Sequence, residues 1–143
     1  SEQSKKALNQ ALELAQKFSA KITLIHVYSA AVPLVPAADT FTTPSVTTPA
    51  SVEMAARILE EAKQMGKQIL DEADKSAKEI GISAEKVLKE GDAVKEIVAL
   101  AEQGRFDLIV VGHRGWSKLK ELLLGAVSEG VSHKAPCPVL IVK

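Results

Sequence analysis

Hydrophobic positions along the 143-residue chain fall into two kinds of pattern. In some segments they recur every three or four residues, which predicts amphipathic helices; in others they form short apolar runs, which predict buried strands. The predicted helices cover residues 8–18, 52–80, 93–103 and part of 119–134. The predicted strands cover residues 21–28, 83–90, 106–111 and 138–143. Helices that alternate with short apolar strands predict an α/β domain with a parallel sheet and helices on both faces.

The ends and faces of these elements carry further predictions. Asp92 is expected to cap the first turn of the third helix, and Gly104 is expected to close that helix. The run 108–111 is apolar on both faces, which predicts a central strand of the sheet. One stripe of the helix over residues 52–80 is expected to face the core. Its members are Ala55, Leu59, Ala62, Met65, Ile69, Ala73 and Ile80.

Residues 29–51 interrupt this pattern. They hold four of the six prolines and five threonines, and no hydrophobic period survives there. We expect a long Pro/Thr/Ala-rich surface loop within a single domain of residues 1–143. The loop follows the first predicted strand, so a lid over a ligand and a plain disordered insertion are both open interpretations.

Composition excludes several classes of function. The 18 basic and 18 acidic side chains leave no net charge, which argues against binding nucleic acid or an anionic membrane over the whole surface. Aromatic residues make up 3 % of the chain, too few for a base-stacking platform. The single cysteine, Cys137, excludes an internal disulfide framework and fits a cytoplasmic location. No apolar run approaches the ~18 residues of a membrane span.

The strongest candidate chemistry follows the predicted strand that ends at Val111. Gly112 and Gly115 flank the exit of the chain from the sheet, and Gly125 follows after nine residues. Glycines at a strand end let backbone amides approach phosphate oxygens, and a helix beginning near Gly125 would point its N-terminal amides at the same anion. The Ser128 hydroxyl could donate one more hydrogen bond. The alternative is that these glycines only form turns.

No catalytic constellation stands out elsewhere. The sequence has no nucleophile elbow, no paired-histidine metal motif and no C-x-x-C pair. Arg114 could clamp a phosphate, with a solvated loop residue as the alternative. His26, near the end of a predicted strand, is expected to be a core or rim histidine and not a catalyst. These observations favour a ligand-binding module over an enzyme.

Taken together, these segments resemble the universal stress protein family. The family's nucleotide motif is G-2x-G-9x-G-(S/T), and the chain reads Gly112-His-Arg-Gly115, nine residues, then Gly125-Ala126. Residues 107–112 and 135–142 match further family segments. The resemblance implies five parallel strands in the order 3-2-1-4-5 and a homodimer that pairs its last strands. The residues of that strand are Val139, Leu140, Ile141 and Val142.

The resemblance also implies a nucleotide-dependent stress sensor or regulator that binds ATP, with Mg²⁺ or Mn²⁺ carried by the phosphates. Val27 would meet the adenine with its backbone, and the glycine segment would surround the ribose and phosphates. The implied nucleotide-binding residues are Val27, Gly112, His113, Arg114, Gly115, Gly125, Ala126, Val127 and Ser128. A non-nucleotide-binding dimeric interaction protein and a slow ATP-hydrolysing enzyme are the alternatives.

Two features depart from the family pattern. Ala126 stands where the family has Ser or Thr, and the lost hydroxyl donor is worth about 0.5–1.5 kcal/mol, or up to about tenfold in affinity. The family's first strand, which is central in the order 3-2-1-4-5, has no counterpart in a sequence that opens on a predicted helix. We therefore expect residues before Ser1, or another chain, to fill that place.

Overall fold

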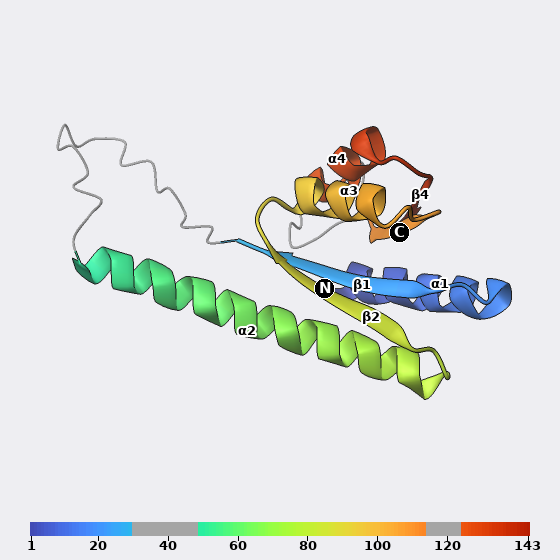
Figure 1. Ribbon diagram of the computed structural model, residues 1–143, viewed down its shortest axis with the longest axis horizontal. Coiled ribbons are helices and arrows are strands. Elements are labelled where there is room, and N and C mark those ends of the chain that lie inside the picture. The colour runs from blue at the N-terminus through green and yellow to red at the C-terminus, as the bar shows by residue number, and fades with distance from the viewer. Residues whose placement is uncertain (30–48, 114–123) are drawn as a thin grey trace.

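The computed structural model of the protein describes residues 1–29, 49–113 and 124–143. Helices and strands alternate along these segments, as the hydrophobic pattern predicts (Figure 1). The helices are α1 (Glu2–Phe18), α2 (Pro49–Glu79), α3 (Ala93–Gln103) and α4 (Ala126–Lys134). The strands are β1 (Ile22–Tyr28), β2 (Ala84–Glu90), β3 (Ile109–Gly112) and β4 (Val139–Val142).

The predicted loop over residues 29–51 is shorter at its end than expected. Most of it, residues 30–48, lies outside the described residues, but residues 49–51 belong to α2. Pro49 opens the helix, which suits proline because a first-turn amide has no helical acceptor and the ring already holds a helical φ.

The strands form two parallel sheets of two strands each. β1 pairs with β2 in a register that sets Ile22 opposite Ala84, and β3 pairs with β4 in a register that sets Ile109 opposite Val139. Parallel pairing is therefore confirmed. The predicted single sheet of five strands is not seen, because no ladder joins β1 to β3 among the residues that the structure describes. β3, expected to be central, has a paired neighbour on one side within this part of the chain.

An apolar cavity of about 90 Å³ lies between the two sheets. β1 lines it from one sheet, β3 lines it from the other, and α3 contributes a third wall. Its lining includes Thr23, Ile25, Ile97, Leu100, Ile109 and Val110. Among the described residues, β1 and β3 thus border the same apolar space without pairing to each other.

Helices cover the strands from both sides. α2 lies against β1 and β2, α1 lies against β3 and β4, and α3 contacts β1 and α4. Figure 1 shows α3 and α4 on one side of the strands and α2 on the other. None of the helices within the described segments is long and apolar enough to cross a membrane.

The face of α2 that packs on the sheet matches the predicted stripe in part, since Ala55, Leu59, Ala62 and Ala73 are partly buried. The residues buried there are Gly66, Leu70, Asp74 and Ala77. Met65, Ile69 and Ile80, which were expected to face the core, are 57 %, 42 % and 41 % exposed. The reason is the close approach of Gly66 to β1, where an added Cβ would lie 2.8 Å from the ring of His26. That approach turns residue 66, and not residue 65, toward the sheet.

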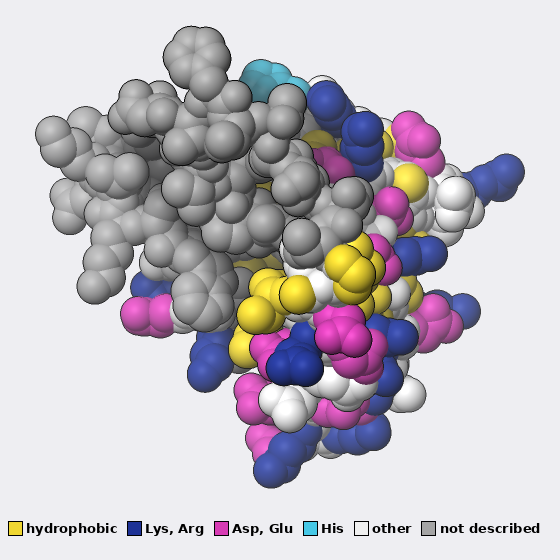
Figure 2. All heavy atoms as spheres, turned by 90° about the vertical axis from the view of Figure 1, so that its left-hand side faces the viewer, with side chains coloured by type: hydrophobic (Ala, Val, Ile, Leu, Met, Phe, Trp, Pro, Cys, Tyr) yellow, Lys and Arg dark blue, Asp and Glu magenta, His cyan; other side chains and the backbone are white. Residues whose placement is uncertain are grey.

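The first turns of α2 extend past the ends of β1 and β2 (Figure 1). Val52, Met54 and Ile58, in these turns, are 58 %, 58 % and 37 % exposed. Figure 2 views the molecule from this side and shows hydrophobic side chains gathered beside charged ones. This end of the long helix therefore leaves apolar side chains at the surface.

A group of ion pairs joins α2 to β2. The Lys86 ammonium lies 2.8 Å from Oδ1 of Asp71 and 3.9 Å from Oδ2 of Asp74, and the Lys78 ammonium lies 2.7 Å from the same Asp74 oxygen. The side chain of Asp74 is 7 % exposed, and its Oδ1 atom has no hydrogen-bond partner among residues 1–29, 49–113 and 124–143. The buried charge of Asp74 therefore depends on these two lysines.

Candidate functional site

The carboxyl end of β3 forms one side of the candidate site. Gly112 is the last residue of β3, and His113 continues the pairing because its amide donates to the carbonyl of Val142 (N···O 2.7 Å). The carbonyl of His113 accepts from the amide of Gly125 (N···O 2.9 Å). The end of β3 and the start of α4 are thus joined directly. Arg114 and Gly115, also predicted to bind nucleotide, lie outside the described residues.

The N-terminus of α4 forms the other side, at the position that the sequence predicts. Gly125 is the N-cap residue, and within the described residues no side chain caps the first turn. Ala126 and Val127 follow it and are both exposed. Because the first amides of a helix have no acceptor within the helix, these N–H groups stand at its positive end without a helical partner. Such a turn is suited to binding a phosphate or another anion.

Ser128, in the same turn, is only 2 % exposed. Its hydroxyl donates toward the carbonyl oxygens of Gly125 (2.9 Å) and His113 (3.1 Å). The hydroxyl that the sequence suggests as a phosphate donor is therefore directed to two backbone carbonyls, one of them at the end of β3.

The start of α1 packs against the same strand end. A Cβ added to Gly112 would lie 2.8 Å from the backbone oxygen of Gln3, so this contact requires glycine. The Oε1 atom of Gln3 is buried and has no hydrogen-bond partner in the part of the chain that the structure describes. Sequence reasoning missed Gln3, because no local pattern announces a contact between the first turn of α1 and the end of β3.

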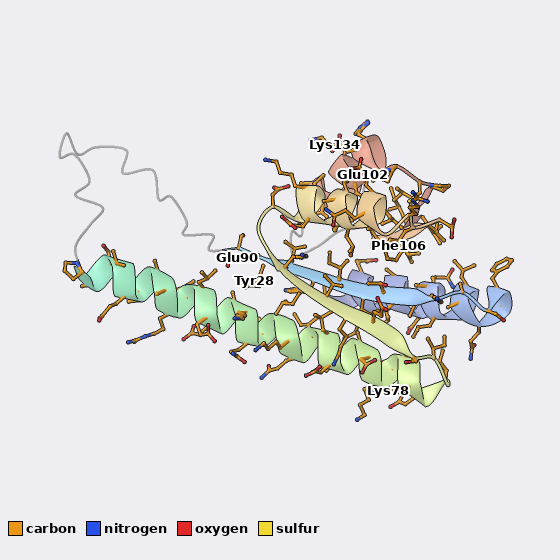
Figure 3. All side chains as sticks on the ribbon, viewed as in Figure 1. Tyr28, Lys78, Glu90, Glu102, Phe106 and Lys134 are labelled. Atoms are coloured by element: carbon orange, nitrogen blue, oxygen red, sulfur yellow. The ribbon has the colours of Figure 1, made fainter. Side chains whose placement is uncertain are left out.

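β1 brings Val27 to this same end of the molecule. α1 begins beside Gly112, and β1 then runs back in the opposite direction (Figure 1). Val27 therefore lies near the carboxyl end of β1, next to Tyr28, whose carbonyl accepts from the Gly91 amide (2.9 Å). Tyr28 and Glu90 mark the paired ends of β1 and β2 (Figure 3). In open α/β sheets, ligands bind beyond the carboxyl ends of the strands.

The environments of His26 and Cys137 disfavour the charged forms of these side chains. Burial lowers the pKa of His26, which lies against α2. Burial, followed by the carboxylate of Asp107, raises the pKa of the Cys137 thiol, which makes it a poor nucleophile at neutral pH. Within residues 1–29, 49–113 and 124–143, no group of three or more His, Cys, Asp or Glu side chains is arranged to hold a metal ion.

Comparison with known proteins places this geometry in a family. The model of the Universal stress protein family matches residues 1–143. The chain belongs to the universal stress protein family. Universal stress protein YxiE of Bacillus subtilis is 39 % identical over 145 residues, which cover 100 % of this chain and 93 % of that protein.

Solved universal stress proteins share the fold. UspA from Lactobacillus plantarum superimposes with a TM-score of 0.81 at 20 % identity, covering 100 % of this chain and 91 % of that one. A universal stress protein in complex with cAMP has a TM-score of 0.66 at 27 % identity, covering 100 % and 90 %. Two more distant members of known structure contain dAMP and AMP, at 19 % and 23 % identity. Several proteins that share this fold therefore bind adenine nucleotides.

Proposed function

We propose that this universal stress protein binds ATP, or another adenine nucleotide, and acts as a nucleotide-dependent stress regulator. The observation that carries the proposal is the first turn of α4, which exposes Ala126 and Val127, has no side-chain cap among the described residues, and is joined to the end of β3. The phosphates would accept hydrogen bonds from its amides, and the backbone of Val27 would meet the adenine. The related protein solved with cAMP supports an adenine nucleotide as the ligand.

The proposed site combines residues from two strand ends and one helix. His113 and Arg114 would border the phosphates, and the glycines would keep the backbone open to them. The residues proposed to form the site are Val27, Gly112, His113, Arg114, Gly115, Gly125, Ala126, Val127 and Ser128. Mg²⁺ or Mn²⁺ would arrive on the nucleotide phosphates, since the described side chains offer no metal-holding cluster. Catalytic turnover of ATP is expected to be slow or absent.

We further propose that the space between β1 and β3 receives a central strand. The order would then be β2-β1-central-β3-β4, which is the family order 3-2-1-4-5. Support comes from β1 and β3, which line the same apolar space without pairing to each other among the described residues, as the two neighbours of a buried strand would. The start of α1 lies against the end of β3, so a parallel strand in this space would end beside that helix. The strand would come from this polypeptide or from another chain.

The proposed assembly is a cytoplasmic homodimer. Within the described residues β4 pairs with β3 on one side. The apolar run Val139–Val142 on an open sheet edge would otherwise favour aggregation, so antiparallel pairing of two β4 strands would protect it. A dimer that binds partners without nucleotide is the second candidate, and Ala126, which lacks the hydroxyl of the family motif, is the observation that favours it.

Isothermal titration with ATP, ADP and AMP at millimolar concentration tests the proposal, with GTP as the control ligand. Ala126→Ser restores the missing hydroxyl and should tighten binding by up to about tenfold. Val127→Asp places a carboxylate at the same amides and should weaken binding at least about tenfold, while the helix N-terminus tolerates the charge. Ser132→Asp, late in the same helix, should leave affinity unchanged. Absence of binding by all three adenine nucleotides would favour the second candidate.

A further inference from the structure

We infer that Ser128 is a positioning residue whose side-chain hydroxyl holds the first turn of α4 against the end of β3. This inference rests on the proposed function, because what it positions is the set of amides that would receive the phosphates. In this inference the hydroxyl of Ser128 bonds groups of the protein, and the backbone amides of the turn contact the ligand.

The carbonyl of His113 is the centre of the arrangement. It accepts from the amide of Gly125 (2.9 Å) and from the hydroxyl of Ser128 (3.1 Å). The His113 amide is itself anchored on β4, through the carbonyl of Val142 (2.7 Å). Two hydrogen bonds therefore hold the start of α4 against the β3–β4 sheet, one donated by a backbone amide and one by a side chain.

The chemistry of a serine hydroxyl restricts its role here. The group carries one proton, so it donates to one acceptor at a time, or shares that proton between two. Both acceptors are protein carbonyls, and the residue is 2 % exposed. A phosphate at the exposed end of α4 would thus be met by the amides of Ala126 and Val127, while Ser128 holds the turn beneath them.

Loss of the hydroxyl should act selectively on ligands with a phosphate. Without it, the carbonyl of His113 keeps only the Gly125 amide as a partner, and the first turn of α4 gains freedom. Binding then has to order that turn, which lowers affinity for groups that need its amides in place. A ligand held only through adenine and ribose would lose much less.

The test compares Ser128→Ala with Ser132→Ala. Both remove a hydroxyl of α4 that bonds a carbonyl three residues earlier, Gly125 for Ser128 and Glu129 for Ser132 (2.9 and 2.7 Å), but Ser132 is exposed and Ser128 also bonds His113. Affinities for AMP and for adenosine are measured by titration. Ser128→Ala should weaken AMP by about fivefold and adenosine by less than about twofold. Ser132→Ala should change neither.

Two further measurements separate positioning from a general loss of structure. In hydrogen-exchange measurements without nucleotide, the Gly125 amide should exchange faster in Ser128→Ala than in the wild-type protein, and should be unchanged in Ser132→Ala. Ser128→Thr keeps the hydroxyl, so its Gly125 exchange rate and its affinity for AMP should match those of the wild-type protein. Equal weakening of AMP and adenosine, or unchanged exchange at Gly125, would overturn the inference. Wild-type protein that binds neither ligand would instead overturn the proposed function on which the inference rests.

Discussion

Gly66 of α2 lies so close to His26 of β1 that a Cβ on residue 66 would sit 2.8 Å from Cδ2 of the imidazole. The same Cβ would sit 2.7 Å from Cδ1 of Leu88 on β2. One glycine thus lets a helix of 31 residues rest on both strands of this sheet. The absence of a side chain at position 66 lets this part of α2 approach the sheet closely.

Gly66→Ala should therefore destabilise the protein, although alanine favours helix. The extra methyl group in this tight contact should destabilise the fold by about 1–3 kcal/mol. The higher helix propensity of alanine should offset about 1 kcal/mol of that loss. We expect a net loss of about 1–2 kcal/mol in the free energy of unfolding, measured by urea denaturation. Gln68→Ala, on the exposed side of the same helix, is the control and should change stability by less than about 0.5 kcal/mol. An increase in stability for Gly66→Ala would contradict this packing.

Lys78→Met should destabilise the protein more than Lys75→Met. Lys78 forms the 2.7 Å ion pair with Asp74, whose carboxylate is 7 % exposed, so its loss leaves a buried charge with only the more distant Lys86. We expect a loss of about 1–3 kcal/mol, whereas the exposed Lys75 should matter by less than about 0.5 kcal/mol. Chemical denaturation of both variants gives the comparison. Equal effects of the two substitutions would show that Asp74 is not held by Lys78.

Stability should fall as the pH drops through the titration range of His26. Burial lowers the pKa of His26 in the folded protein below its value of 6.5 in the unfolded chain, so the unfolded chain binds this proton more readily. The contribution of neutral His26 is therefore complete well above pH 6.5 and is lost as the pH falls toward the folded-state pKa. Thermal unfolding between about pH 7.5 and 5 measures it. His26→Gln should flatten this dependence, and a dependence that persists unchanged in His26→Gln would contradict the assignment.

Gly112→Ala should disturb the protein before any nucleotide is added. The new Cβ would lie 2.8 Å from the backbone oxygen and 2.9 Å from the carbonyl carbon of Gln3, and backbone atoms cannot rotate away as a flexible side chain can. We expect a loss of stability of about 1–3 kcal/mol, seen in thermal or urea unfolding of the ligand-free protein. If Gly112→Ala left stability unchanged but weakened nucleotide binding, Gly112 would be needed for the ligand and not for the packing of α1 against β3.

Much of this fold follows from local sequence patterns. The pattern of apolar residues predicted the strands and the first three helices of the described segments. Asp92 caps α3 as expected, since its carboxylate accepts from the amide of Lys95 (2.9 Å). The sequence places a helix only within residues 119–134, and α4 begins at Ala126 with Gly125 as its N-cap, near where the glycine spacing would allow a helix to start. These features depend on neighbours within one turn, which is the range over which sequence patterns carry information.

Features that depend on distant contacts could not be predicted. Met65 and Ile69 fit the apolar period of α2, but the approach of Gly66 to His26 turns them toward solvent. Ser128 was recognised as a polar residue of the candidate site, yet its partners, the carbonyls of His113 and Gly125, follow from how α4 sits on β3. The glycine spacing located the candidate site, and tertiary packing determines what each polar group there can donate.

The most direct test of the central claim is an amide chemical-shift titration of the ¹⁵N-labelled protein with ATP and AMP. If an adenine nucleotide binds at the start of α4, the largest shifts should fall on the amides of Gly112, His113, Gly125, Ala126 and Val127, with Val27 responding to the base. Residues late in α4, such as Ser132, should shift little. No shifts at millimolar nucleotide, or shifts confined to another surface, would contradict the proposed function.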